Sequence, residues 1–203
     1  SDVKAEIKVN GKTIGRIDGN DWQGSKRDFA SNQVSIVTTG NGRLYYWWEA
    51  EGISASGQYV EEDNFIKVRK RFYNRNGQPI SGNTFAQNEL IIIGITLENA
   101  YSNQVENIVI TDLLPAGFEI ENPRTKEIPG MEWIKDGESP KALDVRDDRI
   151  HFFVDLVKQK QVYYYAVRAV SPGNYKMGPV SADAMYKGEI HSYHGAGKIK
   201  VVR

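Results

Sequence analysis

The chain has 203 residues, and its 26 lysine and arginine residues balance 26 aspartate and glutamate residues, so the formal net charge is zero. Nucleic-acid binding is excluded because it needs a positive field. A mean hydropathy of −0.52, without any apolar run of about 18 residues, argues against a membrane-spanning helix. The absence of cysteine excludes disulfide bonds, thiolate metal sites and a thioester within this chain.

Hydrophobic residues alternate with polar ones from the N-terminus onward, at Ala5–Val9, Val34–Ile36 and Ile66–Val68. The dipeptides Asn10-Gly11 and Asn76-Gly77 are typical of hairpin turns. Further strands, rich in Ile, Val, Tyr or Phe, are predicted over Glu89–Glu98, Val105–Thr111, Arg149–Leu156, Val162–Val170 and Lys198–Val202. No window of about 12 residues keeps the apolar spacing of an amphipathic helix free of glycine and proline. The sequence therefore predicts an all-β protein.

The predicted strands fall into two parts. Those from about residue 64 to the C-terminus suit a β-sandwich of about seven strands, fibronectin-like or immunoglobulin-like in shape. The small, polar stretch Ser54–Gln58 followed by the acidic stretch Glu61–Asp63 is typical of a linker. We therefore divide the chain into a smaller β-sheet segment, 1–58, and a sandwich domain, 59–203.

The smaller segment offers few strands for an independent domain, because a small sheet buries little apolar area. We expect it to be a half-domain whose inward-facing residues Ile7, Val9, Val34 and Ile36 form an exposed apolar face. Such a face favours association.

His191, His194 and Glu189 lie within six positions, so a metal site has to be considered. Residues i and i+3 of a strand point to opposite faces, so the two imidazoles converge only if the backbone bends. We expect a solvated strand end here and no bound metal.

Four acidic residues, Glu138, Asp144, Asp147 and Asp148, are close enough in sequence to suggest a glycosidase-like acid/base pair. The Asp-Asp pair before Arg149 is better explained as a turn, because Asx side chains bond their own backbone. No phosphate-binding loop, dinucleotide fingerprint or nucleophile elbow occurs in the sequence. We therefore expect no catalytic residue, no cofactor and no enzyme activity.

Two aromatic runs, Tyr45–Trp48 and Tyr163–Tyr165, are the most suggestive feature outside the core pattern. Neighbouring strand residues face opposite sides, so part of each run faces away from the nearest core. Trp47, Trp48 and Tyr164 are therefore candidates for a ligand or partner surface, for example one that stacks on sugars. The alternative is that protein covers both faces.

The run Thr111–Pro123, TDLLPAGFEIENP, resembles a signature found near the C-terminal end of bacterial alpha-2-macroglobulins. Three later segments are similar, in the same order, to the final macroglobulin domain of that family: Asp147–Val154, Tyr165–Tyr175 and Asp183–Tyr186. Val68–Tyr73 with Gly77–Ile80 resembles the domain's opening strand and hairpin. The resemblance spans about residues 60–203.

The resemblance implies the macroglobulin β-sandwich fold for this region, and part of a split CUB-like domain for the segment before it. It also implies a non-enzymatic module of a broad-spectrum protease trap, located in the periplasm or cell envelope, with a lipid anchor far upstream in some members. The implied partners are the thioester domain, the other domains of the same chain and the target proteases. Since this chain has no cysteine, any thioester would lie elsewhere in the full-length protein.

Met185 and Tyr186 match a Met-Tyr pair that, by the resemblance, helps to shield the thioester from water. A flexible Met beside an amphipathic Tyr suits an adaptable apolar lid. The alternative is that Met185 fills the core while Tyr186 is merely exposed. The following Lys187-Gly188 departs from the proline common in the family and relaxes the backbone there. A carbohydrate-binding or adhesin-like sandwich remains the alternative to the protease-trap module.

Overall fold

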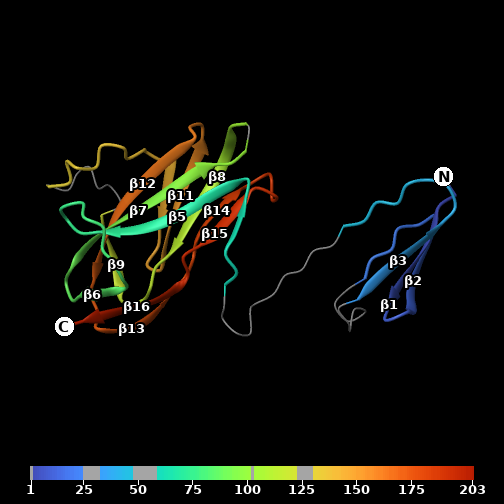
Figure 1. Ribbon diagram of the computed structural model, residues 1–203, viewed down its shortest axis with the longest axis horizontal. Helices are drawn as coiled ribbons and strands as arrows, with labels where there is room; N and C mark the ends of the chain where they lie inside the picture. The colour runs from blue at the N-terminus through green and yellow to red at the C-terminus, as the bar shows by residue number, and fades with distance from the viewer. Residues whose placement is uncertain (1, 25–32, 48–58, 102, 123–129) are drawn as a thin grey trace. The chain divides into compact units, whose positions relative to one another are not determined.

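The computed structural model describes residues 2–24, 33–47, 59–101, 103–122 and 130–203, and these form strands without any helix (Figure 1). The all-β prediction is confirmed. No helix that could cross a membrane is found among these residues. The chain forms two compact units, Ser1–Ile53 and Ser54–Arg203. The domain boundary expected between residues 58 and 59 lies at the end of the stretch 48–58, which is outside the described residues.

The first unit contains a three-stranded antiparallel sheet in the order β2-β1-β3. Its strands are β1 (Lys4–Val9), β2 (Lys12–Asp18) and β3 (Val34–Thr39). Asn10 and Gly11 join β1 to β2, and both adopt positive φ angles, 50° and 77°. Two left-handed residues in succession are what a tight hairpin turn of type I′ requires, so the turn predicted from this dipeptide is confirmed.

One face of this sheet is polar and the other apolar. On the polar face Lys4 pairs with Asp18, and Glu6 pairs with Lys8 and Arg16. These pairs are largely exposed and contribute little to stability. The polar ladder nevertheless sets the register of the strands, because a slip by one residue would place these charges on the apolar face.

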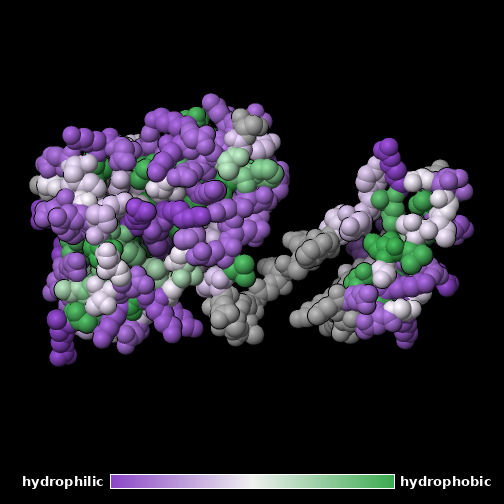
Figure 2. Space-filling view, viewed as in Figure 1, coloured by the Kyte–Doolittle hydropathy of each residue, from purple (hydrophilic) through white to green (hydrophobic). Residues whose placement is uncertain are grey.

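The apolar face is only partly exposed. Ile7 and Val9 are buried, while their β3 partners Ile36 and Val34 are 38% and 47% exposed. The predicted exposure is therefore confirmed for β3 and wrong for β1, because β1 is the central strand and has a neighbour on each side. The indole of Trp22 also occupies the space that a side chain at Gly15 would take. Figure 2 shows the hydrophobic surface that remains on this unit.

The second unit is the predicted sandwich, and its described residues form thirteen strands rather than seven because short edge segments also pair. The strands are β4 (Glu62–Asn64), β5 (Ile66–Tyr73), β6 (Thr84–Ala86), β7 (Leu90–Asn99), β8 (Val105–Leu113), β9 (Phe118–Asn122), β10 (Ala142–Val145), β11 (Arg149–Leu156), β12 (Lys160–Ala169), β13 (Gly173–Met177), β14 (Val180–Ala184), β15 (His191–His194) and β16 (Gly197–Val202). One large sheet has the order β10-β11-β8-β14-β15-β4, and the other β5-β7-β12-β9. A small third sheet, β13-β16-β6, lies near the C-terminus (Figure 1).

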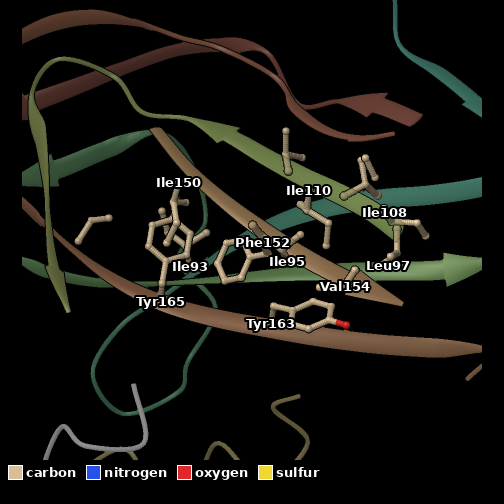
Figure 3. Close-up of a cluster of buried hydrophobic side chains, with 14 of the residues drawn as sticks. Ile93, Ile95, Leu97, Ile108, Ile110, Ile150, Phe152, Val154, Tyr163 and Tyr165 are labelled. Carbon is tan, nitrogen blue, oxygen red and sulfur yellow. The ribbon is translucent and has the colours of Figure 1, made fainter. Parts of the chain in front are cut away.

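The core lies between the two large sheets (Figure 3). Strand β7 is buried on both sides: Ile93 and Ile95 face this core, whereas Ile92 belongs to a second cluster with Met131 and Ile134. Burial on both sides explains why the sequence runs continuously apolar here instead of alternating.

A buried ion pair crosses this core. Lys70 Nζ on β5 lies 2.6 Å from Asp112 Oδ1 on β8, and Tyr165 Oη on β12 donates a hydrogen bond of 2.7 Å to Asp112 Oδ2. The side chains of Lys70 and Asp112 are 4% and 0% exposed. Burial, followed by the neighbouring Asp112 carboxylate, raises the pKa of Tyr165 well above its ordinary value. The network links the two sheets.

Candidate functional site

The turn after β14 presents the two residues expected to shield a thioester. Met185 and Tyr186 are 52% and 81% exposed. The alternative in which Met185 fills the core is wrong, because the inward alternation of β14 ends at the buried Ala184 and the chain then turns toward β15. The expectation that Tyr186 is largely accessible is confirmed.

Main-chain hydrogen bonds hold this turn. The Lys187 N–H donates to Ala184 O at 3.2 Å, and the Ile190 N–H donates to Lys187 O at 2.8 Å. Ile190 is buried and anchors the return of the chain. Lys187 closes the turn through both of these bonds without a proline, while a side chain at Gly188 would meet open space.

A second contact fixes the start of the turn. The Met185 N–H donates to Asn107 O at 2.9 Å, and the Asn107 N–H donates to Asp155 Oδ1 at 2.9 Å. Asn107 has a φ of 56°, a left-handed conformation that asparagine tolerates better than most residues. The Lys141 ammonium, followed by the Asn107 N–H, lowers the pKa of the Asp155 carboxyl. Met185 is therefore held in place by a chain of contacts from β8 and β11.

The aromatic candidates lie in different surroundings. Trp47 is 79% exposed, and Trp48 lies outside the described residues. Tyr164 is partly buried in a cluster with Tyr73 and Trp133, with ring centroids 6.2 Å and 5.8 Å away. The Tyr164 hydroxyl also donates to Asp136 Oδ1 at 3.2 Å. Ligand or partner binding by these residues stays a prediction.

The two candidate histidines pair with different carboxylates. His191 Nε2 lies 3.4 Å from Glu62 Oε1, and His194 Nε2 lies 3.1 Å from Glu61 Oε2. Within the described ranges no group of three or more His, Cys, Asp or Glu side chains is arranged to hold a metal ion. The two imidazoles therefore contact the carboxylates of Glu61 and Glu62, at the start of the β4 segment.

The acidic candidates are also paired singly. Asp144 contacts Arg146, Asp148 contacts Arg149, and Glu138 contacts Lys158. The Arg149 guanidinium lowers the pKa of the Asp148 carboxyl. Each of these carboxylates therefore faces a cation instead of a second carboxylate, which is not the arrangement of an acid/base pair.

The acidic stretch Glu61–Asp63, interpreted from the sequence as linker, is largely part of the sandwich. Residues 62–64 form β4, which pairs with β15. Asp63 accepts hydrogen bonds from Arg69 and from Ser192 Oγ, and these contacts lower the pKa of the Asp63 carboxyl to about 2. The linker interpretation is wrong for these residues because their carboxylates find partners on the sandwich.

Comparison with known proteins agrees with this architecture. The family model for the bacterial alpha-2-macroglobulin MG10 domain matches residues 66–189, so the chain belongs to that family. It is 26% identical over 180 residues to alpha-2-macroglobulin of Pasteurella multocida, covering 86% of this chain and 9% of the relative. It is 29% identical over 179 residues to that of Xylella fastidiosa strain 9a5c, covering 82% of this chain and 10% of the relative. The chain therefore spans about a tenth of the length of these relatives.

Solved structures show the same fold. Salmonella alpha-2-macroglobulin reacted with methylamine superposes with a TM-score of 0.65 at 17% identity, covering 98% of this chain and 13% of that one. Native Escherichia coli alpha-2-macroglobulin from domain MG7 to the C-terminus gives a TM-score of 0.62 at 23% identity, covering 72% of this chain and 25% of that one. The all-β macroglobulin fold inferred from the sequence is thereby confirmed.

Proposed function

We propose that this chain is a non-enzymatic structural module of a bacterial alpha-2-macroglobulin that traps proteases in the periplasm or cell envelope. Its partners are the thioester domain and the other domains of the same full-length protein, which in turn engages the target proteases. Residues 1–58 belong, in this proposal, to a split CUB-like domain. The membership of residues 66–189 in the MG10 family supports the proposal.

Within this module, the Met185–Tyr186 turn packs against the thioester domain and keeps water from the reactive bond. The observation that carries this step is the exposure of both side chains on a turn fixed by main-chain hydrogen bonds. A fixed turn presents its side chains without the entropy loss of ordering a flexible loop. The Met thioether adapts to an uneven surface, and the Tyr ring covers apolar area while its hydroxyl stays near water.

Replacing Tyr186 with alanine in the full-length protein should accelerate the spontaneous reaction of the thioester with methylamine. Burying a large side chain is worth about 1.5–3 kcal/mol, which corresponds to an increase of roughly 10- to 150-fold in opening of the contact. The rate of the reaction is measured from the amount of thiol that it releases. The variant Tyr59→Ala removes another exposed tyrosine of the same unit and should leave the rate unchanged.

Unfolding of the isolated chain separates this effect from misfolding. Because Tyr186 is 81% exposed, its replacement should change the free energy of unfolding by less than about 0.5 kcal/mol. A thioester rate equal to that of the unchanged protein would contradict the shielding role.

The second candidate function is carbohydrate binding by the first unit. It is favoured by the exposure of three consecutive aromatic residues, Tyr45, Tyr46 and Trp47, since exposed aromatic rings suit stacking on sugars. It does not account for the match of residues 66–189 to a macroglobulin domain. We therefore rank it below the protease-trap module.

A further inference from the structure

The edge of β5 is only partly paired. β5 is the outer strand of its sheet, and the Ala100 N–H donates to Phe65 O at 2.9 Å, so the peptide groups of odd-numbered β5 residues face β7. The peptide groups of even-numbered β5 residues face away from β7, toward the open edge of the sheet. In agreement, the Val68 N–H donates to Ser192 Oγ at 2.9 Å, and Phe72 O accepts from the Ile80 N–H at 2.9 Å.

Between these two contacts the Val68 C=O accepts a hydrogen bond of 2.7 Å from Arg69 Nη1. The three outward-facing main-chain groups that remain there are the N–H and C=O of Lys70 and the N–H of Phe72. Among the residues that the structure describes, none of these groups has a hydrogen-bond partner in the protein. A short segment of sheet edge is thus open between Ser192 and Ile80. Open edges of this kind accept a further strand.

A cavity of about 400 Å³ lies beside this open edge. Its other walls come from Pro79, Ile80, Gly82 and Asn83 and from the connection between β15 and β16 at Gly195–Gly197. Phe72, Ile80 and Met177 supply apolar surface. A side chain at Gly82 or Gly195 would meet nothing within 4 Å, so there is room for another backbone to approach closely.

The ionisable residues that line the cavity all have basic side chains: Lys70, Arg71 and His194. Lys70 is already paired with Asp112, and His194 with Glu61. Arg71 is exposed and forms no ion pair with any described residue. The remaining charge at this site is therefore positive, and its complement is a carboxylate.

We propose that this cavity receives an extended acidic segment of the same full-length protein, which adds as a short strand to β5 and places a carboxylate on Arg71. The proposal rests on the proposed function only in treating this chain as part of a longer protein. Three main-chain groups give a weak contact between separate molecules. A segment linked to the chain is present at a high effective concentration, which favours an intramolecular occupant.

Photo-cross-linking in the full-length protein tests the proposal. Benzoylphenylalanine is placed at Asn83, an exposed residue of the cavity wall, and in a separate control at Asp147, an exposed residue of the β10–β11 turn. We expect mass spectrometry to identify, from Asn83, a cross-link to an acidic segment of the same chain. The control position should give none.

Charge reversal supplies the matched pair of variants. Arg71→Glu should lower the yield of the Asn83 cross-link by about tenfold, because like charges then oppose each other. Lys67→Glu makes the same charge change on the same face of β5, outside the cavity, and should leave the yield unchanged. An Asn83 yield no higher than at Asp147, equal effects of the two variants, or a cross-link to a protease or a second copy would each overturn the proposal.

The thioester reaction of the Tyr186→Ala protein, measured beside the cross-link from Asn83, separates this inference from the shielding role. If the cavity proposal fails while Tyr186→Ala still accelerates the reaction with methylamine, only the inference about β5 is lost. If the cross-link forms as expected while Tyr186→Ala has no effect, the shielding role is lost and the β5 site stands.

Discussion

Replacing Asp112 with alanine should lower the free energy of unfolding of this chain by about 3–5 kcal/mol, because the substitution leaves the Lys70 ammonium buried without a partner. It also removes the acceptor of the Tyr165 hydroxyl. Chemical denaturation followed by tryptophan fluorescence measures the change. Trp133 is a suitable reporter because it packs on the sandwich against Tyr73 and Tyr164.

Two further variants give this prediction its controls. Asp147→Ala removes an exposed carboxylate and should alter the free energy of unfolding by less than about 0.5 kcal/mol. The double variant Lys70→Met, Asp112→Leu replaces the whole pair by apolar side chains and should be clearly more stable than Asp112→Ala. A loss below about 1 kcal/mol for Asp112→Ala, the scale of an exposed ion pair, would show that the pair is not buried in solution.

Alkaline pH should also destabilise the sandwich strongly. Burial raises the pKa of Tyr163 from 10 to about 12. The folded state then holds the Tyr163 proton more tightly than the unfolded state does. The contribution of this proton to the free energy of unfolding is therefore complete below pH 10 and is lost as the pH rises to 12. The shift corresponds to about 3 kcal/mol, and the raised pKa of Tyr165 adds a loss in the same direction.

The measurement is the free energy of unfolding at several pH values between 9 and 12. Tyr163→Phe removes one ionisable group and gives up only the hydrogen bond that Gln161 Nε2 donates to the hydroxyl. This variant should show a shallower decline over the same range. Equal slopes for the variant and the unchanged protein would mean that Tyr163 ionises without unfolding.

The sequence predicts the local features well. The Asn10-Gly11 turn follows from the need for two positive φ angles, and strands such as β7 and β12 follow from their content of Ile, Val and Tyr. By contrast, β14 is not predicted, because its sequence, Val-Ser-Ala-Asp-Ala, has low strand propensity. It forms a strand because it lies between β8 and β15, a pairing that depends on residues far away in the sequence.

The site is predictable to a similar degree. The resemblance of one short segment indicates Met185 and Tyr186, but not that Asn107 and Asp155 hold the turn. Asp112 follows Ile108 and Ile110 at the inward positions of β8, which signals a buried carboxylate that needs a partner. The sequence does not reveal that the partner is Lys70, because the contact joins strands of different sheets. The open edge of β5 likewise becomes visible only once its neighbours are in place.

The central claim is that the turn carrying Met185 and Tyr186 is a contact surface within a larger protein. Hydroxyl-radical footprinting of these two side chains, in this chain and in the full-length protein before any protease is added, tests it most directly, with Tyr59 as the internal reference. Both side chains should be labelled readily in this chain, where they are exposed, and be strongly protected in the full-length protein. Equal labelling of Met185 and Tyr186 in the two proteins would contradict the account.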